Sequence, residues 1–318
     1  MTLLNQTSDG LLPAMLALRR ALLAFGPMQR EDLENLCGPQ SLGGKRRLAH
    51  LTLSTWTNLG MFSRPSDTGA PIELCEPFRS IQPDDIDSLR TRVLDLLMRS
   101  DNVPTLAEEG DSKVQRASDF ARCASWLLAQ DVYRLTASNE GELRTMSVDQ
   151  QTSPDLFPGT GRWSGFQAWG YFTGLGMPTA MGFVMNPARA VRSVLDDVLP
   201  VGSEFLATHF IERLAERVPV LDRGSYRQAV ERQTANPWRT FGPDELSPSL
   251  SLALAQLHHE VELVLDDRMG DVANRLTLLG RGGHPWRSFT HVRRTTPVWP
   301  GAANRNTTDI APTTLGDG

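Results

Sequence analysis

The segment KRRLAHLTLSTWTNLGMFSRP, residues 45–65, carries the clearest structural signal in the N-terminal part of the chain. It opens with three cations, continues with leucines at helical spacing and reaches Gly60, a residue that commonly ends helices. On a helical wheel the expected buried stripe has these members: Leu48, Leu51, Thr52, Thr55 and Leu59, with Trp56 on its flank. The opposite side carries these residues: Arg46, His50, Leu53 and Thr57, with Arg47 and Ser54 beside them. We therefore predict a helix over residues 41–60 with a polar, basic outward face.

Two further helices are expected before this stretch and a hairpin after it. The first has apolar residues at a spacing of three to four, with Pro13 in its first turn; they are Met15, Leu18, Leu22 and Phe25. The second runs from Gln29 to Cys37 and is expected to bury Leu33 and Leu36. In residues 62–76, Ile72 and Leu74 alternate with polar neighbours, as in a short hairpin. Three helices and a hairpin in this order predict a winged helix-turn-helix over residues 1–80.

A winged helix-turn-helix commonly reads DNA through the N-terminal part of its third helix. The expected DNA-binding residues are Lys45, Arg46, Arg47, His50, Ser54, Thr57 and, at the base of the wing, Arg64. The same fold also serves as a protein-docking module, and an outward Leu53 would suit a partner interface better than a wet groove. Double-stranded DNA and partner proteins therefore both remain as expected ligands.

The remaining sequence predicts a mainly α chain with small β-hairpins, an α+β fold. Residues 81–150 are expected to form a helical linker region that ends in a loop, with a domain boundary near residue 150. Residues 151–294 are expected to form a helical domain in which EVELVLDD and ANRLTLLG pair as a hairpin, giving a second winged-helix-like unit. Its aromatic residues at 163–172 favour core packing over base stacking. Residues 295–318 have little to bury and are expected to be disordered.

The composition is typical of a soluble globular protein with an acidic body. The 318 residues carry a formal net charge of -5, so that nucleic-acid contact requires a local basic patch. The three cysteines, Cys37, Cys75 and Cys123, lie far apart and predict neither disulfides nor a zinc site. The start of the chain does not resemble a signal peptide, and no apolar run is long enough to cross a bilayer. We expect a cytoplasmic protein without membrane contact.

Motifs for catalysis are missing from the sequence. It contains no phosphate-binding G-x-x-x-x-G-K-[ST], no G-x-S-x-G and no H-E-x-x-H. Asp84, Asp111 and Lys113 resemble the elements of a Mg²⁺-dependent nuclease, but a helix start and a loop are not expected to bring them to one metal ion. We therefore expect no enzymatic activity, no metal and no cofactor.

Two segments carry a family resemblance. LLNQTSDGLLPAMLALRRALLAFGPMQREDLENLC, residues 3–37, and RSFTHVRR, residues 287–294, resemble the DpdG family. This family belongs to bacterial dpd clusters, which insert 7-deazaguanine bases into DNA and restrict unmodified DNA. The resemblance implies an accessory role in antiviral defence beside helicase and nuclease partners, and it implies no catalytic residue. The alternative function is a stand-alone winged-helix transcriptional regulator, which would need a dimer and a small-molecule pocket, with residues 163–172 as the candidate.

Overall fold

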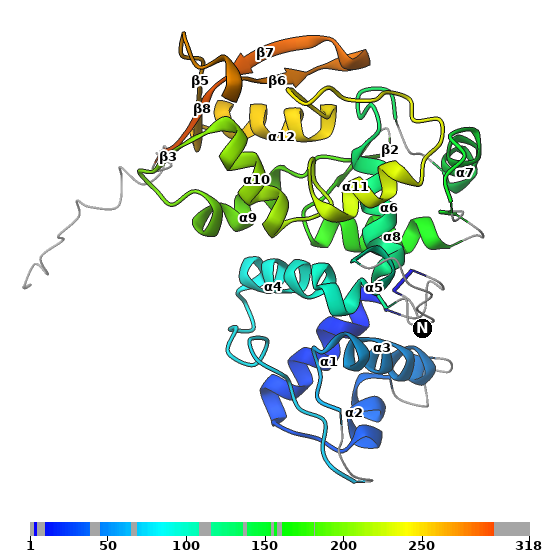
Figure 1. Cartoon of the computed structure of the whole chain (residues 1–318). Coiled ribbons are helices and arrows are strands. Elements are labelled where there is room, and N and C mark those ends of the chain that lie inside the picture. The colour runs from blue at the N-terminus through cyan, green and yellow to red at the C-terminus, as the bar shows by residue number, and fades with distance from the viewer. Residues whose placement is uncertain are drawn as a thin grey trace, which may run out of the picture.

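Short helices dominate the chain, and they are arranged in a lower lobe and a larger upper lobe (Figure 1). The computed structural model describes residues 3–4, 10–38, 45–64, 69–107, 116–135, 139–153, 156–157, 161–180 and 182–295, without the side chains of residues 45–47, 105, 107 and 272. The sheets are small, with two or three strands each. The expected mainly α chain with small β elements is confirmed. The tail predicted to be disordered lies, from residue 296 on, outside the described residues.

The lower lobe contains three helices, α1 (Leu12–Phe25), α2 (Arg30–Cys37) and α3 (Lys45–Leu59). Pro13 lies in the first turn of α1, and Gly26, with φ of 76°, caps its end. Gly60, with φ of 101°, follows α3 and donates its N–H to the carbonyl of Trp56 over 3.1 Å. The three expected helices are therefore confirmed. Leu36, however, is 49% exposed, so its predicted burial is wrong, and Phe25 at the end of the apolar pattern of α1 is 69% exposed.

Three extended segments pair beside these helices. Met28 bridges Ile72, and Phe62 bridges Leu74, both in antiparallel fashion. The N–H of Cys75 donates to the carbonyl of Met61 over 2.9 Å, which continues the second pairing. The segment around Ile72 and Leu74 is therefore the middle one of three. The expected hairpin is confirmed, while its turn at residues 65–68 lies outside the described residues.

Part of the upper lobe repeats this connectivity. Its elements are, in order, α9 (Ala188–Val198), β3 (Glu204–Leu206), α10 (Ala207–Arg217), α12 (Pro248–His259), β5 (Leu263–Asp266) and β8 (His291–Arg294). The three strands form an antiparallel sheet in the order β3-β8-β5. As in the lower lobe, the strand between the first two helices and the strand after the last helix both pair with the final strand.

The prediction that EVELVLDD and ANRLTLLG, which contain β5 and β6, pair with each other as a hairpin is wrong. β5 pairs with β8, whereas β6 (Leu276–Leu279) lies in another sheet, between β4 (Glu245–Leu246) and β7 (Pro285–Phe289). The β4–β6 pair is parallel and the β6–β7 pair is antiparallel. Residues 267–290 thus form an insertion between two paired strands. Adjacency in the sequence favoured the wrong partner because neighbouring strands usually pair.

The remaining elements lie between the two repeats, except for the last three of the following list, which are inserted within the upper repeat. They are α4 (Ile86–Met98), η2 (Ser100–Asn102), α5 (Pro104–Ala107), α6 (Ser118–Leu128), α7 (Glu140–Asp149), α8 (Arg162–Phe172), β1 (Met177–Thr179), β2 (Gly182–Val184), α11 (Ser225–Arg232), η3 (Val272–Asn274) and η4 (Arg281–Gly283). The loop expected around residue 150 is wrong in part, because α7 occupies residues 140–149. Asn139 caps α7 by accepting from the N–H of Glu142 over 2.9 Å. The helix was missed because Leu143 is its one fully buried apolar residue.

A single buried cluster runs through both lobes. Trp56 of α3 and Trp169 of α8 meet with ring centroids 4.8 Å apart, and the Trp169 Nε1–H donates to the Gly10 carbonyl over 2.8 Å. The core packing predicted for residues 163–172 is confirmed for four aromatic residues, namely Trp163, Phe166, Trp169 and Phe172, while Tyr171 is 41% exposed. The division into domains at residues 80 and 150 stays a prediction. The buried cluster has members on both sides of each position.

Candidate nucleic-acid interface

One row of polar side chains on α3 faces solvent at the lower end of the molecule. His50 and Asn58 are exposed and Ser54 between them is half-buried, at a spacing of four residues. A spacing of four places side chains one above another on one helix face. We call His50, Ser54 and Asn58 the α3 row. The rest of the described part of α3 is largely covered, by α1 and α2 on one side and by Trp169 on another.

Leu53 does not belong to this surface. Its side chain is fully buried, together with those of Trp56 and Leu59, in the core between the lobes. The predicted outward position, and with it the partner interface at Leu53, is wrong. The helical wheel assumed one buried side, but α3 packs against two neighbours and therefore buries a wider arc. Leu48 and Leu51, which were expected in the core stripe, are only half-buried.

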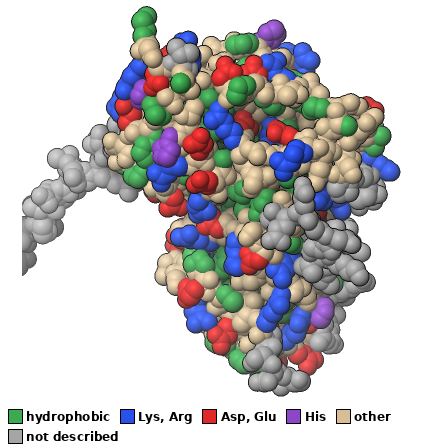
Figure 2. All heavy atoms as spheres, in the orientation of Figure 1, with side chains coloured by type: hydrophobic (Ala, Val, Ile, Leu, Met, Phe, Trp, Pro, Cys, Tyr) green, Lys and Arg blue, Asp and Glu red, His purple; other side chains and the backbone are tan. Residues whose placement is uncertain are grey.

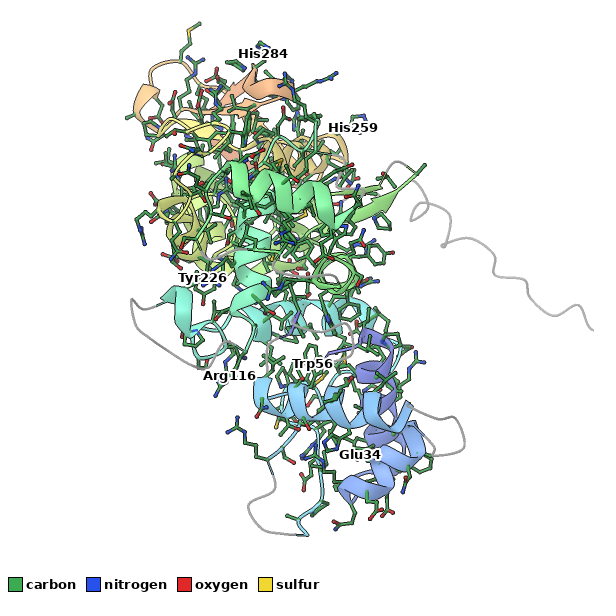
Figure 3. All side chains as sticks on the ribbon, turned by 90° about the vertical axis from the view of Figure 1, so that its right-hand side faces the viewer. Glu34, Trp56, Arg116, Tyr226, His259 and His284 are labelled. Carbon is green, nitrogen blue, oxygen red and sulfur yellow. The ribbon has the colours of Figure 1, made fainter. Side chains whose placement is uncertain are left out.

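A buried carboxylate fixes one side of the α3 row. Glu34 of α2 is 5% exposed, and its Oε1 accepts from Arg30 Nε over 2.8 Å and lies 2.9 Å from His50 Nδ1. Arg30 Nη2 in turn donates to Ser54 Oγ over 2.5 Å. Two residues of the row are therefore held by α2. Figure 3 shows Glu34 among the side chains at the lower end of the molecule.

The other side of the row is flanked by the hairpin. Arg64 is exposed, and its Nη2 donates to Asn58 Oδ1 over 3.3 Å. Thr57 is half-buried, and its Oγ1 has no hydrogen-bond partner among the described residues. The structure thus brings three predicted residues, His50, Ser54 and Arg64, to one surface. The side chains of Lys45, Arg46 and Arg47 lie outside the described residues.

Sequence reasoning missed two residues of this surface, Arg30 and Asn58. Arg30 stands four residues before Glu34 on α2, a spacing that predicts an ion pair but does not show that the pair reaches α3. Asn58 is four residues beyond Ser54, so the same helical spacing points to it. Figure 2 shows arginine side chains beside a histidine on the lower lobe.

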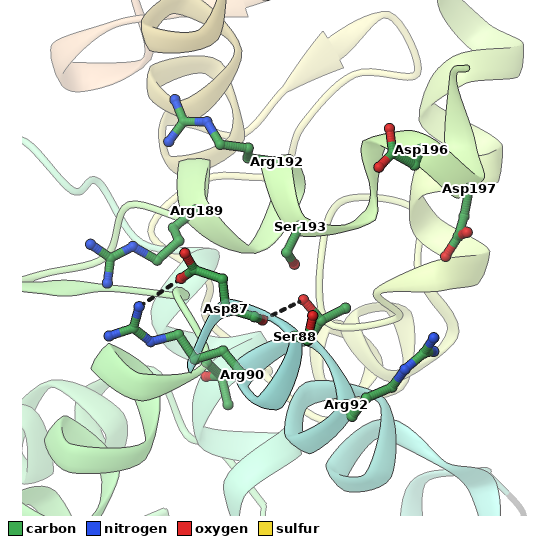
Figure 4. Close-up of a pocket in the computed structure, with 11 residues that line it drawn as sticks. Asp87, Ser88, Arg90, Arg92, Arg189, Arg192, Ser193, Asp196 and Asp197 are labelled. Carbon is green, nitrogen blue, oxygen red and sulfur yellow. Dashed lines mark hydrogen bonds and ion pairs between the residues drawn. The ribbon is translucent and has the colours of Figure 1, made fainter. Parts of the chain in front are cut away.

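A hollow lies elsewhere on the molecule, between α4 and α9. It has a volume of about 620 Å³ and is lined by Asp87, Ser88, Arg90, Thr91, Arg92, Thr173, Arg189, Arg192, Ser193, Asp196 and Asp197 (Figure 4). Most of its charges are already compensated: Arg90 pairs with Asp87, and Arg192 pairs with Glu260 and Glu262. The hollow therefore offers little unpaired charge to a ligand.

The described residues hold no cluster of metal-binding side chains. Among them, no three His, Cys, Asp or Glu side chains lie close enough to bind one metal ion. Asp84 is exposed just before α4, and Asp111 and Lys113 lie outside the described residues. Burial raises the pKa of the Cys123 thiol to about 12, which leaves it protonated and unreactive at neutral pH. In the described part of the chain, no helix has the length and apolar character needed to cross a membrane.

Comparison with known proteins gives one match. A family model described as DpdG-like matches residues 1–269 of the 318. The chain belongs to the DpdG-like family. The N-terminal segment that carried the resemblance lies inside the matched range, whereas RSFTHVRR at residues 287–294 lies beyond it. No curated protein and no solved structure matches the chain. The α3 surface falls within the family range, and so does most of the buried core, apart from Leu276, Leu278, Phe289 and Val292.

Proposed function

We propose that this member of the DpdG-like family is a non-enzymatic winged-helix component of the dpd defence system, acting in the cytoplasm, and that it binds duplex DNA through α3. The observation that carries the proposal is the α3 row, an open polar stripe flanked by Arg30 on one side and Arg64 on the other. Family membership supports a role in the dpd system. The DNA-binding role is inferred from the surface itself, because a fold alone does not define a ligand.

The connectivity of the lower lobe supports the winged-helix assignment. Helix, short strand, two helices and two final strands follow one another, and the last strand lies between the other two. In such a fold the third helix enters the major groove, and the hairpin lies beside the phosphate backbone. Here α3 is the third helix. Arg64, which hydrogen-bonds to Asn58, stands at the base of the hairpin.

The upper lobe has the same connectivity, but its third helix is not available to DNA. In α12 the first turn is buried, and Ser249 Oγ donates to the carbonyl of Leu128 over 2.6 Å. Ser247, the N-cap, donates its hydroxyl to Asp222 Oδ1 over 2.6 Å and is buried as well. We therefore assign the upper repeat a structural role and the lower repeat the DNA contact.

The chemistry of the α3 surface suits a duplex. Arginine side chains at the edge of a surface contact phosphates, while His, Ser and Asn side chains can hydrogen-bond to base edges. By helical spacing, Arg46 occupies the position one turn before His50. The surface therefore has phosphate-binding groups on its flanks and hydrogen-bonding groups along its centre.

The alternatives lose support from the same geometry. Docking of a partner protein on α3 relied on an outward Leu53, which is buried. A stand-alone regulator needed a pocket in the aromatic cluster, whose rings instead pack on one another: Trp163 stacks on Phe166 at 5.6 Å and meets Phe183 edge-on at 5.6 Å. The helicase and nuclease partners implied by the family remain expected, at a surface other than α3.

Fluorescence anisotropy on a labelled duplex at several salt concentrations tests the proposal. Arg46→Ala/Arg47→Ala and Arg64→Ala are compared with Arg144→Ala, an exposed arginine of α7 far along the chain. We expect wild type to bind with a salt-dependent affinity and the double variant to lower the logarithmic salt slope by roughly two. Wild-type binding without salt dependence, or α3 variants that bind like Arg144→Ala, would contradict the proposal.

A further inference from the structure

A second basic surface lies at the opposite end of the molecule, on the β4-β6-β7 sheet. Its members come from three segments far apart in the sequence: Arg134, Arg239, Arg281, His284 and Trp286. We call them the β7 surface. Figure 3 shows His284 at the upper end, with Glu34 at the lower end and Trp56 between them. The β7 surface and the α3 row therefore cannot form one continuous footprint.

The turn before β7 brings three arginines together. Gly282 and Gly283 have φ of 67° and 74°, a conformation that favours glycine. A Cβ on Gly283 would lie 2.6 Å from Arg239 Nη1, and one on Gly282 would lie 3.2 Å from Arg134 Nη2. Two guanidinium groups thus pack directly over the backbone of the turn, and Arg281 is the first residue of the same turn. A side chain at either glycine would have to displace one of these guanidinium groups.

Trp286 adds an open aromatic side chain to this group. The pairing of β6 with β7 is irregular at this point, since Leu278 faces Arg287 while Leu279 faces Pro285, which leaves Trp286 as the extra residue of a bulge. Bulges re-aim side chains out of the regular ladder. Trp286 is 52% exposed, although most tryptophans of the described chain are buried or half-buried.

The charge of the β7 surface is only partly compensated. Arg134 Nε lies 3.4 Å from the buried Asp131 carboxylate and keeps two thirds of its side chain exposed, at 66%. Arg239 pairs with Glu245 over 2.6 Å. Arg281 and His284 have no acidic partner within 4 Å among the described residues. The surface is therefore locally cationic on a chain whose formal net charge is -5.

A narrow pocket opens beside Arg239 and extends this surface inward. It has a volume of about 170 Å³, and its walls include Trp126, Trp238 and Phe241 together with the amides of Gln130 and Gln150. Trp238 and Phe241 meet edge-on with centroids 5.8 Å apart. Unpaired bases stack on aromatic side chains, whereas the Gln130 and Gln150 amides already hydrogen-bond to each other over 2.8 Å.

We propose that the β7 surface binds single-stranded DNA, with Trp286 stacking on a base and the three arginines facing the phosphates. Exposed aromatic side chains interleaved with cations are the means by which proteins hold unpaired strands, whereas a duplex keeps its bases stacked inside and gives an indole nothing to stack on. The choice of DNA over RNA rests on the proposed function at α3. A chain with a duplex surface at one end and a single-strand surface at the other fits the boundary between paired and unpaired DNA.

The test is anisotropy with a fluorescein-labelled oligo-dT, an oligo-rU of equal length and a duplex. The variants are Trp286→Ala and Arg281→Ala/His284→Ala, and the matched control is Met269→Ala, which removes another exposed apolar side chain from a turn outside the β7 surface. We expect Trp286→Ala to weaken oligo-dT binding roughly fivefold to a hundredfold. Duplex binding should stay unchanged in this variant, and Arg46→Ala/Arg47→Ala should show the reverse pattern.

The outcomes separate the two surfaces. Oligo-dT binding that depends on Trp286 while no protein binds duplex supports the β7 surface and contradicts the proposed function at α3. Wild type that fails to bind oligo-dT, or Trp286→Ala that binds it like Met269→Ala, overturns the inference. Tighter binding of oligo-rU than of oligo-dT overturns the assignment to DNA. Circular dichroism of each variant establishes that a lost affinity does not come from unfolding.

Discussion

Glu34 is the residue on which the geometry of the α3 surface depends. It is buried, and it holds Arg30 and His50 from two different helices with one carboxylate oxygen. Removing one partner of a buried ionic network leaves the others incompletely paired, which costs more than losing an exposed pair. Sequence alone predicts the helical pair of Arg30 and Glu34, but it contains no sign that Glu34 is covered by α3.

We predict that Glu34→Gln lowers the free energy of unfolding by about 1–3 kcal/mol. The amide keeps the shape of the side chain but loses the charge that holds Arg30. Glu73→Gln serves as the control, because the Glu73–Arg79 pair is 41% and 55% exposed and its loss should cost less than about 1 kcal/mol. Urea denaturation followed by circular dichroism measures both. Equal effects of the two substitutions would show that Glu34 does not anchor the row.

At the scale of single elements, the positions of most helices followed from capping residues and apolar spacing. Pro13 and Gly26 bound α1, Ser247 caps α12, and Gly60 follows α3. Which face each helix buries was harder to derive. The apolar periodicity of a helix predicts its buried face only when the helix packs against a single neighbour. The pairing of β5 with β8 across an insertion has no local signal at all.

The corrected orientation of α3 predicts how leucine substitutions behave. Leu53→Ala should destabilise the protein by about 2–5 kcal/mol, because it leaves a cavity in a packed core. Leu36→Ala on α2 removes the same atoms from a side chain that is 49% exposed and should cost less than about 1 kcal/mol. Thermal denaturation of the two variants compares them directly. If Leu53→Ala were as mild as Leu36→Ala, the orientation expected from the helical wheel would be the right one.

At the scale of the whole molecule, the sequence did not predict how closely the lobes are joined. The boundary near residue 150 rested on polar composition, yet three contacts tie distant segments together. Arg217 Nη1 of α10 pairs with Asp95 of α4 over 2.5 Å, the Tyr226 hydroxyl donates to the Met98 carbonyl over 2.9 Å, and Trp56 meets Trp169. Contacts this remote in the sequence leave no periodic pattern, so they become visible only in the folded chain.

The shared core predicts that the two lobes unfold together. Differential scanning calorimetry of the full chain should give one transition whose calorimetric and van't Hoff enthalpies agree, as expected when no intermediate is populated. Trp56→Ala, which empties the contact with Trp169 at the lobe junction, should move this single transition to lower temperature, with a loss of about 3–5 kcal/mol in stability. Two transitions in the wild type, of which Trp56→Ala shifts only one, would instead support independent folding of residues 1–80. In that case residues 1–80 would fold and unfold independently of the rest of the chain, and the Trp56–Trp169 contact would join two lobes that are each already folded.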